Sequence, residues 1–205
     1  MDSITPTMNI DEAMAMLEGT MAELHEAQAQ LATCQAQLDE MNMLVFEQSA
    51  TDPLTGLKNR AAFERIMNQQ SARTGRSKAP LALLMVDVDH LKKFNEEFGR
   101  VGGDDVLQKV AQVLKGHARA YDYVVRYESD EFAVVLPDTS LASAMVVAER
   151  VRHAINGIAW RHQGASVSVG AAESSSIQDG QTVVQRARVA LDQAKKSGGN
   201  RVTQA

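Results

Sequence analysis

A seven-residue repeat near the start of the chain constrains its fold more than any other sequence feature. Residues 9–48 contain no proline and one glycine. Apolar residues recur every seven positions, at Ile10, Leu17, Leu24, Leu31, Leu38 and Val45. The positions four residues after the first five of these hold Met14, Met21, Gln28, Gln35 and Asn42. This alternating spacing of four and three predicts a helical domain over residues 1–48 that forms a coiled coil.

The residue types along this seam favour a parallel homodimer. Leucine at one seam position, with polar residues at several of the others, favours two parallel strands and fixes their register. A helix of about 35 residues, rising ~1.5 Å per residue, makes a rod of about 50 Å that joins two copies of whatever follows. The alternative is an amphipathic helix that folds back on its own domain. Cys34 lies beside the seam, and we expect it to be inert.

The pattern changes at Pro53 and Gly56, and residues 52–205 read as one globular domain. Helices are expected over residues 59–71, 90–98, 104–118, 141–156 and 181–196. Strands are expected over 81–87, 123–127, 132–136 and 165–171, with a short end at 200–202. The two middle strands flank a tight turn and form a hairpin. Together these elements predict an α+β fold, a palm-like relative of the ferredoxin fold with a central antiparallel hairpin in a helix-covered sheet.

Composition excludes several classes of function. A formal net charge of −5 argues against binding a nucleic acid polymer, which requires lysine and arginine over phosphates. The longest apolar run, residues 81–86, is far shorter than the ~20 residues of a membrane span, so no membrane insertion is expected. One cysteine fits a reducing compartment. Because the first residues also lack a basic segment followed by an apolar one, we expect a cytoplasmic protein.

Carboxylates gather at two predicted strand ends. Asp87 and Asp89 follow the strand that starts at Leu81, and residues 128–131 (Glu-Ser-Asp-Glu) form the hairpin turn. If the first strand lies between the two hairpin strands, Asp87 and Asp130 converge. Such a pair suits Mg²⁺ (or Mn²⁺), which binds through one or two carboxylates plus substrate phosphates. The alternative is that these acids only solvate the sheet edge.

Five segments in order resemble the GGDEF family, the diguanylate cyclases. They are DPLTGLKNR at 52–60, VDVDHLKKFNEEFGRVGGDDVL at 86–107, RAYDYVVRYESDEFAVVLPDT at 119–139, SVSVGAA at 166–172 and AKKSGGNRV at 194–202. The resemblance implies that two GTP molecules are condensed into cyclic di-GMP, with one GTP held by each domain of a dimer. The predicted coiled coil would supply the dimer.

The resemblance also implies a role for individual residues. Asp87 and Asp130 match the family's metal-binding acids, and Glu131 matches the acid that helps to deprotonate the attacking 3′-hydroxyl, so that Asp130 and Glu131 form the catalytic pair. The GTP-binding positions divide into two pairs. Asn95 and Asp104 match residues that read the guanine edge, and Lys92 and Lys195 match lysines that hold the triphosphate.

The signature itself departs from the family pattern, because Glu128 and Ser129 replace two glycines. If Glu128 points inward, a second negative charge ~5 Å away costs about 3 kcal/mol at an effective dielectric near 20. If it points outward, it costs little. In the last segment, Gly199 stands where the family has a phosphate-binding arginine.

A second motif is intact. Arg119 and Asp122 frame an RxxD motif that ends five residues before the signature, at the offset of the family's inhibitory product site. We therefore expect a signalling protein that binds cyclic di-GMP at this motif, with weak or no cyclase activity. The alternative is an active cyclase with product feedback at the same motif. A third hypothesis is a partner-binding cargo on a dimeric rod.

Overall fold

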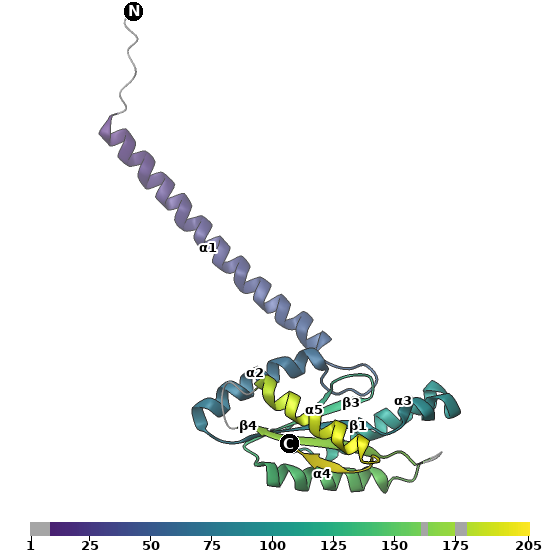
Figure 1. Cartoon of the computed structure of the whole chain (residues 1–205). Helices are drawn as coiled ribbons and strands as arrows, with labels where there is room; N and C mark the ends of the chain where they lie inside the picture. Colours follow the sequence, from purple (N-terminus) through teal and green to yellow (C-terminus); the bar gives the residue numbers. More distant parts are fainter. Residues whose placement is uncertain (1–8, 161–163, 175–179) are drawn as a thin grey trace, which may run out of the picture. The chain divides into compact units, whose positions relative to one another are not determined.

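The chain divides into two compact units, Met1–Gln48 and Ser49–Ala205, in a computed structural model that describes residues 9–160, 164–174 and 180–205 (Figure 1). The first unit is built on helix α1 (Ile10–Ser49). Its predicted seam is more than half exposed at every described apolar side chain, namely Met14, Leu17, Met21, Leu24, Leu31 and Leu38. The side chains of Ile10, Asn42 and Val45 lie outside the described residues. An exposed apolar stripe of this kind is what a partner helix would cover, and the coiled coil stays a prediction.

The second unit contains a five-stranded sheet in the order β2-β3-β1-β4-β5. Its strands are β1 (Leu81–Val88), β2 (Tyr123–Arg126), β3 (Glu131–Pro137), β4 (Val167–Ser174) and β5 (Val202–Gln204). Strand β1 is antiparallel to β3 and β4, and β5 is parallel to β4. The predicted α+β class and hairpin are confirmed.

The first strand does not lie between the two hairpin strands. Strands β2 and β3 pair directly with each other, and β1 lies between β3 and β4. Only residues 127–130 connect the hairpin strands, and so short a loop leaves no room for a third strand between them. The end of β1 still meets the start of β3, because these two strands are antiparallel neighbours.

Helices cover both faces of the sheet, which explains why β1 is buried throughout and, apart from Asp87, apolar. On one face Ala82, Leu84 and Val86 join a core with α3 (Leu91–His117) and α4 (Leu141–Asn156). On the other face lie α2 (Arg60–Ser77) and α5 (Gly180–Lys196), which Figure 1 shows on the opposite side of the strands from α4. Among the described residues, no helix is long and apolar enough to cross a membrane.

The two helices predicted over 90–98 and 104–118 are one element, α3, with a break at Gly99. Gly99 has φ 78° and ψ 167°, a conformation that glycine adopts without steric cost. The break folds the first turns of α3 toward the rest of the helix, and a side chain at Gly103 would overlap the Asn95 amide. The segment containing Asn95 thus packs closely against the segment containing Gly103.

A second glycine sets the distance between α5 and the sheet. Gly170 of β4 lies opposite Met85 of β1 and is covered by α5. A Cβ atom at Gly170 would overlap the carbonyl oxygen of Ala187 and the backbone nitrogen of Leu191. The backbone of α5 therefore rests directly on β4, at a distance that only glycine permits.

Replacing Gly170 by alanine is expected to lower the free energy of unfolding by at least 1–3 kcal/mol, a rough range for an overpacked core, because α5 has to move away from β4. Urea denaturation of the purified chain measures the change. Gly116→Ala is the matched control, because a Cβ at this position of α3 meets open space. That variant is expected to be as stable as the parent or up to about 1 kcal/mol more stable. Equal denaturation midpoints for Gly170→Ala and the parent would contradict the packing.

Candidate functional site

Three carboxylates meet where β1 ends and β3 begins. The register of the two strands places Asp87 directly opposite Glu131, so the two side chains share one face of the sheet. The backbone nitrogen of Val88 donates to the carbonyl oxygen of Asp130 at 3.2 Å, which holds Asp130 at the same place. Asp87 and Asp130 line one pocket together with Lys92 and Lys195. The predicted convergence of Asp87 and Asp130 is therefore present.

Asp87 is the most buried acid of this group, with 4% of its surface exposed. Burial raises the pKa of Asp87 to about 6, and the charges of Asp130 and Glu131 push it in the same direction. Lys195 opposes the shift, because its Nζ lies 2.6 Å from Asp87 Oδ2. The site thus concentrates negative charge around one buried carboxylate and already attracts one cation.

These residues fit a divalent metal ion. Among the described residues, no group of three or more His, Cys, Asp and Glu side chains has an arrangement that would hold a metal alone. The protein instead offers two carboxylates, Asp87 and Asp130, beside an open pocket. Mg²⁺ is usually bound in this way, with substrate phosphates and water completing its coordination. The buried, mutually repelling acids would be stabilised by such a cation.

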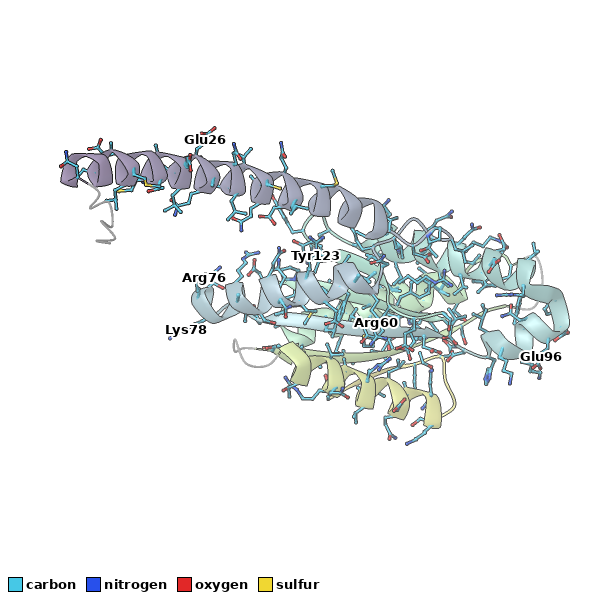
Figure 2. The ribbon with its side chains drawn as sticks, turned by 90° about the horizontal axis from the view of Figure 1, so that it is seen from above. Glu26, Arg60, Arg76, Lys78, Glu96 and Tyr123 are labelled. Atoms are coloured by element: carbon cyan, nitrogen blue, oxygen red, sulfur yellow. The ribbon has the colours of Figure 1, made fainter. Side chains whose placement is uncertain are left out.

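Glu128, the residue that replaces the first glycine of the signature, is directed to two arginines. Its Oε1 accepts from Arg60 Nη1 at 3.1 Å and from Arg188 Nη2 at 2.9 Å. Arg60 is the first residue of α2, and Figure 2 shows it at one end of this helix, with Arg76 at the other end. Glu128 also lines a shallow surface with Arg60 and Tyr127. Its charge is therefore paired.

Arg126 fixes the backbone of the same turn. Its Nη2 donates to the carbonyl oxygen of Ser129 at 2.7 Å, and its Nη1 lies 3.0 Å from both carboxylate oxygens of Asp52. The side chains of Arg126 and Asp52 are only 15% and 16% exposed, so this ion pair is well shielded from water. Arg126 thus connects the start of the globular unit to the signature turn.

The predicted guanine-reading residues lie together in a neighbouring pocket. Asn95 and Asp104 line it with Lys92, and Ser129 and Asp130 form its other side. The Oδ1 atom of Asn95 is buried and has no hydrogen-bond partner among the described residues. Buried polar atoms usually have a hydrogen-bond partner, so this oxygen has an acceptor capacity that the described residues do not use. This pocket can therefore offer an amide and a carboxylate to a bound base.

The turn after α5 closes the pocket of Asp87. Gly198, Gly199 and Asn200 all have positive φ, at 108°, 71° and 47°. Asp89 holds this turn by accepting from the backbone nitrogen of Asn200 at 2.9 Å. It also accepts from the hydroxyls of Ser166 and Ser168, each at 2.6 Å. Asp89 therefore anchors the turn instead of joining Asp87 as a free carboxylate.

Gly199 fits its own surroundings closely. A Cβ at this position would lie 3.1 Å from Asp89 Oδ1. Beside it, Arg201 donates from Nε to the carbonyl oxygen of Gly199 at 3.2 Å. Its Nη2 lies 3.6 Å from where a Cβ of Gly198 would be, and Gly198 lines the Asp87 pocket. Arg201 therefore brings a guanidinium near this pocket, although residue 199 is a glycine and not an arginine.

The RxxD motif forms a separate surface turn. The backbone nitrogen of Arg119 donates to Asp122 Oδ2 at 2.7 Å, and the backbone nitrogen of Asp122 donates back to the carbonyl oxygen of Arg119 at 3.1 Å. The side chain of Arg119 is exposed. The turn precedes β2 and the signature turn follows it, so the two lie at opposite ends of one strand. The structure does not bring Arg119 and Asp122 to the carboxylate site.

Sequence reasoning missed Arg60, Arg126 and Arg188. Arg188 and Lys195 are seven residues apart, and a spacing of seven places them on one face of α5. That spacing was a usable signal for Arg188. No local pattern marks Arg60 or Arg126, because their partners come from distant parts of the chain.

Comparison with known proteins gives consistent matches. The family model "Diguanylate cyclase, GGDEF domain" matches residues 49–201. Diguanylate cyclase DgcP of Pseudomonas aeruginosa is 37% identical over 160 residues, which cover 76% of this chain and 24% of DgcP. Response regulator PleD of Caulobacter vibrioides is 36% identical over 163 residues, which cover 76% of this chain and 36% of PleD. The chain thus spans only about a quarter to a third of these two relatives.

A solved structure extends the likeness to the N-terminal helix. The coiled coil and GGDEF domain of DgcB from Caulobacter crescentus, in complex with c-di-GMP, matches with a TM-score of 0.76 and 29% identity. The match covers 91% of this chain and 99% of that chain. Its extent shows that a helix followed by this α+β domain is an arrangement found in another protein.

The buried charge of Asp87 makes stability depend on pH. Because the pKa of Asp87 is raised in the folded state, ionisation of this group costs stability as pH rises from about 4 to about 6. Asp87→Asn is therefore expected to stabilise the protein more at pH 7.5 than at pH 4.5, by up to about 3 kcal/mol. Urea denaturation at the two pH values tests this, with the exposed Asp192→Asn on α5 as control. An Asp87→Asn effect of the same size at both pH values would contradict the burial.

Proposed function

The chain belongs to the GGDEF domain family, and we propose that it is a diguanylate cyclase module that condenses two GTP molecules into cyclic di-GMP. The observation that carries the proposal is the arrangement at the ends of β1 and β3. There Asp87 and Asp130 line a pocket with Lys195, and Glu131 lies opposite Asp87 on β3. Glu128 is paired with Arg60 and Arg188.

The proposed reaction is nucleotidyl transfer. The transfer occurs twice, once in each direction. Each time the 3′-hydroxyl oxygen of one GTP forms a bond to the α-phosphorus of the other and the bond from that phosphorus to the bridging oxygen of the β-phosphate breaks, so that two pyrophosphates leave in all. A divalent cation held by Asp87 and Asp130 would neutralise charge on the phosphates. Glu131 is assigned the role of accepting the proton of the attacking hydroxyl. Lys92, Lys195 and Arg201 supply positive charge to the triphosphate.

Guanine selection is assigned to the pocket next to the carboxylates. The Asp104 carboxylate can accept from the N1–H and N2–H₂ donors of guanine, a donor face that adenine lacks. The Asn95 amide, whose Oδ1 is buried without a partner among the described residues, can form a further hydrogen bond. Their shared pocket with Asp130 would put the base and the reacting phosphate within one nucleotide's length.

The placement of Glu128 supports activity over the weak or absent activity that the sequence favoured. The sequence left open whether this carboxylate points at the nucleotide. Two guanidiniums at 3.1 and 2.9 Å offset its charge, so the repulsion estimated for an inward carboxylate does not apply to this arrangement. Arg201 likewise offers a guanidinium near the position where Gly199 lacks one.

Two copies of the chain would be needed for one turnover, because each domain has one set of metal and guanine residues. The exposed stripe of α1 offers the means, since Leu24, Leu31 and their neighbours would be covered in a parallel coiled coil. We therefore propose a homodimer held by α1, with the two bound GTP molecules facing each other.

Binding of cyclic di-GMP at the RxxD turn is the second proposed activity. The exposed Arg119 guanidinium is planar and suits guanine and phosphate acceptors, while the Asp122 carboxylate suits guanine donors. Because the turn is one strand length from the signature, product bound there would not occupy the carboxylate pocket. It would act as feedback control on the cyclase, or as the main function if turnover is absent.

Turnover tests the proposal directly. The full chain, freed of co-purified nucleotide, is incubated with GTP and Mg²⁺, and cyclic di-GMP is measured by chromatography. We expect product from the parent and about 100-fold less from Asp130→Asn, which loses a proposed metal ligand. Arg119→Ala is expected to bind cyclic di-GMP more weakly and to form more product. No turnover by the parent, with cyclic di-GMP binding that Arg119→Ala abolishes, would contradict the cyclase and support the binding function.

The dimer has its own test. Leu24→Asp combined with Leu31→Asp places charges in the seam and is expected to give a monomer by light scattering, with product formation reduced at least about tenfold. Gln30→Asp combined with Thr33→Asp adds the same charges away from the seam and is expected to keep the dimer. A dimer that survives the leucine substitutions would show that α1 does not hold it.

A further inference from the structure

A cluster of four charged side chains surrounds Tyr127 beside the carboxylate site. Arg188 Nη2 donates to Glu128 Oε1 and to Glu131 Oε2, each at 2.9 Å. Arg60 Nη1 approaches the same Glu128 oxygen at 3.1 Å. Arg188 therefore joins the first residue of the signature turn to its acid Glu131.

The aromatic ring of Tyr127 fixes the two guanidiniums. The Cζ atoms of Arg60 and Arg188 lie 4.8 and 5.0 Å from the ring centroid, within the range of a cation–π contact. The ring itself is 6% exposed and packs edge-on against Phe63, with centroids 5.0 Å apart. Because the ring is buried, it gives both guanidiniums a fixed surface to pack on.

The members of the cluster differ in how firmly each is held. Glu131 is 17% exposed and lies opposite Asp87 on the sheet, whereas Glu128 is 41% exposed at the turn. Arg188 is held by both carboxylates, which contact the same Nη2 atom. Without Glu128, Arg188 would keep only its contacts with Glu131 and the Tyr127 ring. Its guanidinium could then move together with Glu131 toward the phosphates of a bound GTP.

We propose that Glu128 is a positioning residue, which holds Arg188 in place and through it fixes the Glu131 carboxylate for proton transfer from the attacking hydroxyl. This role rests on the proposed cyclase function. In this role Glu128 does not impair the site. The glutamate that replaces the first glycine of the signature instead helps to orient Glu131.

Steady-state kinetics of the full chain separate this role from a loss of nucleotide binding. Glu128→Gln is expected to lower kcat about tenfold and leave the KM for GTP within about twofold, because Glu131 acts on the hydroxyl and not on the triphosphate. Arg188→Gln is expected to have the same effect. The double variant is expected to be no worse than Arg188→Gln alone, since both changes break one chain of contacts.

A matched control is Asp105→Asn, which breaks an exposed ion pair with Lys109 on α3 by the same acid-to-amide change and is expected to leave kcat unchanged. Unchanged kcat in Glu128→Gln overturns the inference while the cyclase stands. Losses that add in the double variant also overturn it, because independent effects do not pass through Arg188.

Crystal structures of the parent and Glu128→Gln test the positioning without any need for turnover. The inference expects the Arg188–Glu131 contact to shift or break in the variant, with the fold unchanged. An identical Glu131 carboxylate in the two crystals overturns the inference. A parent that makes no cyclic di-GMP would instead overturn the proposed function, and the two crystals would still show whether Glu128 holds Arg188 and Glu131 in place.

Discussion

The close packing of α5 against β4 at Gly170 is the constraint on which the site depends. With no Cβ between them, the helix backbone rests on the strand and carries Arg188 and Lys195 on one face, seven residues apart. These two cations reach Glu131 and Asp87, which are cross-strand neighbours on β3 and β1. The sheet presents the acids as a pair, and the helix supplies a matching pair of cations.

This arrangement explains how a chain with a net charge of −5 can hold anionic ligands. The acids are concentrated where a divalent cation would be needed, and Asp87 and Glu131 are each paired with a nearby cation, Lys195 and Arg188. The altered signature is paired locally in the same way. Glu128 forms ion pairs with Arg60 and Arg188, and the carbonyl oxygen of Ser129 accepts a hydrogen bond from Arg126. Local pairing therefore decides what this turn can do.

The features that the sequence predicted have local causes. The strand from Leu81, the hairpin and the break near Pro53 follow from hydrophobic patterns and turn residues within a few positions, and the acids of residues 87 and 130 follow from strand ends. The place of β1 between β3 and β4 was not predictable, because a hairpin pattern does not say which edge a third strand takes. The direction of Glu128 was not predictable, because Arg60 and Arg188 are 68 and 60 residues away in the chain.

A crystal structure of the full chain with Mg²⁺ and a non-hydrolysable GTP analogue tests the central claim most directly. The account predicts the α-phosphate and the cation between Asp87 and Asp130, the base against Asn95 and Asp104, and Glu128 still paired with Arg60 and Arg188. A Glu128 carboxylate turned into the nucleotide pocket, or an analogue bound away from Asp87, would contradict it.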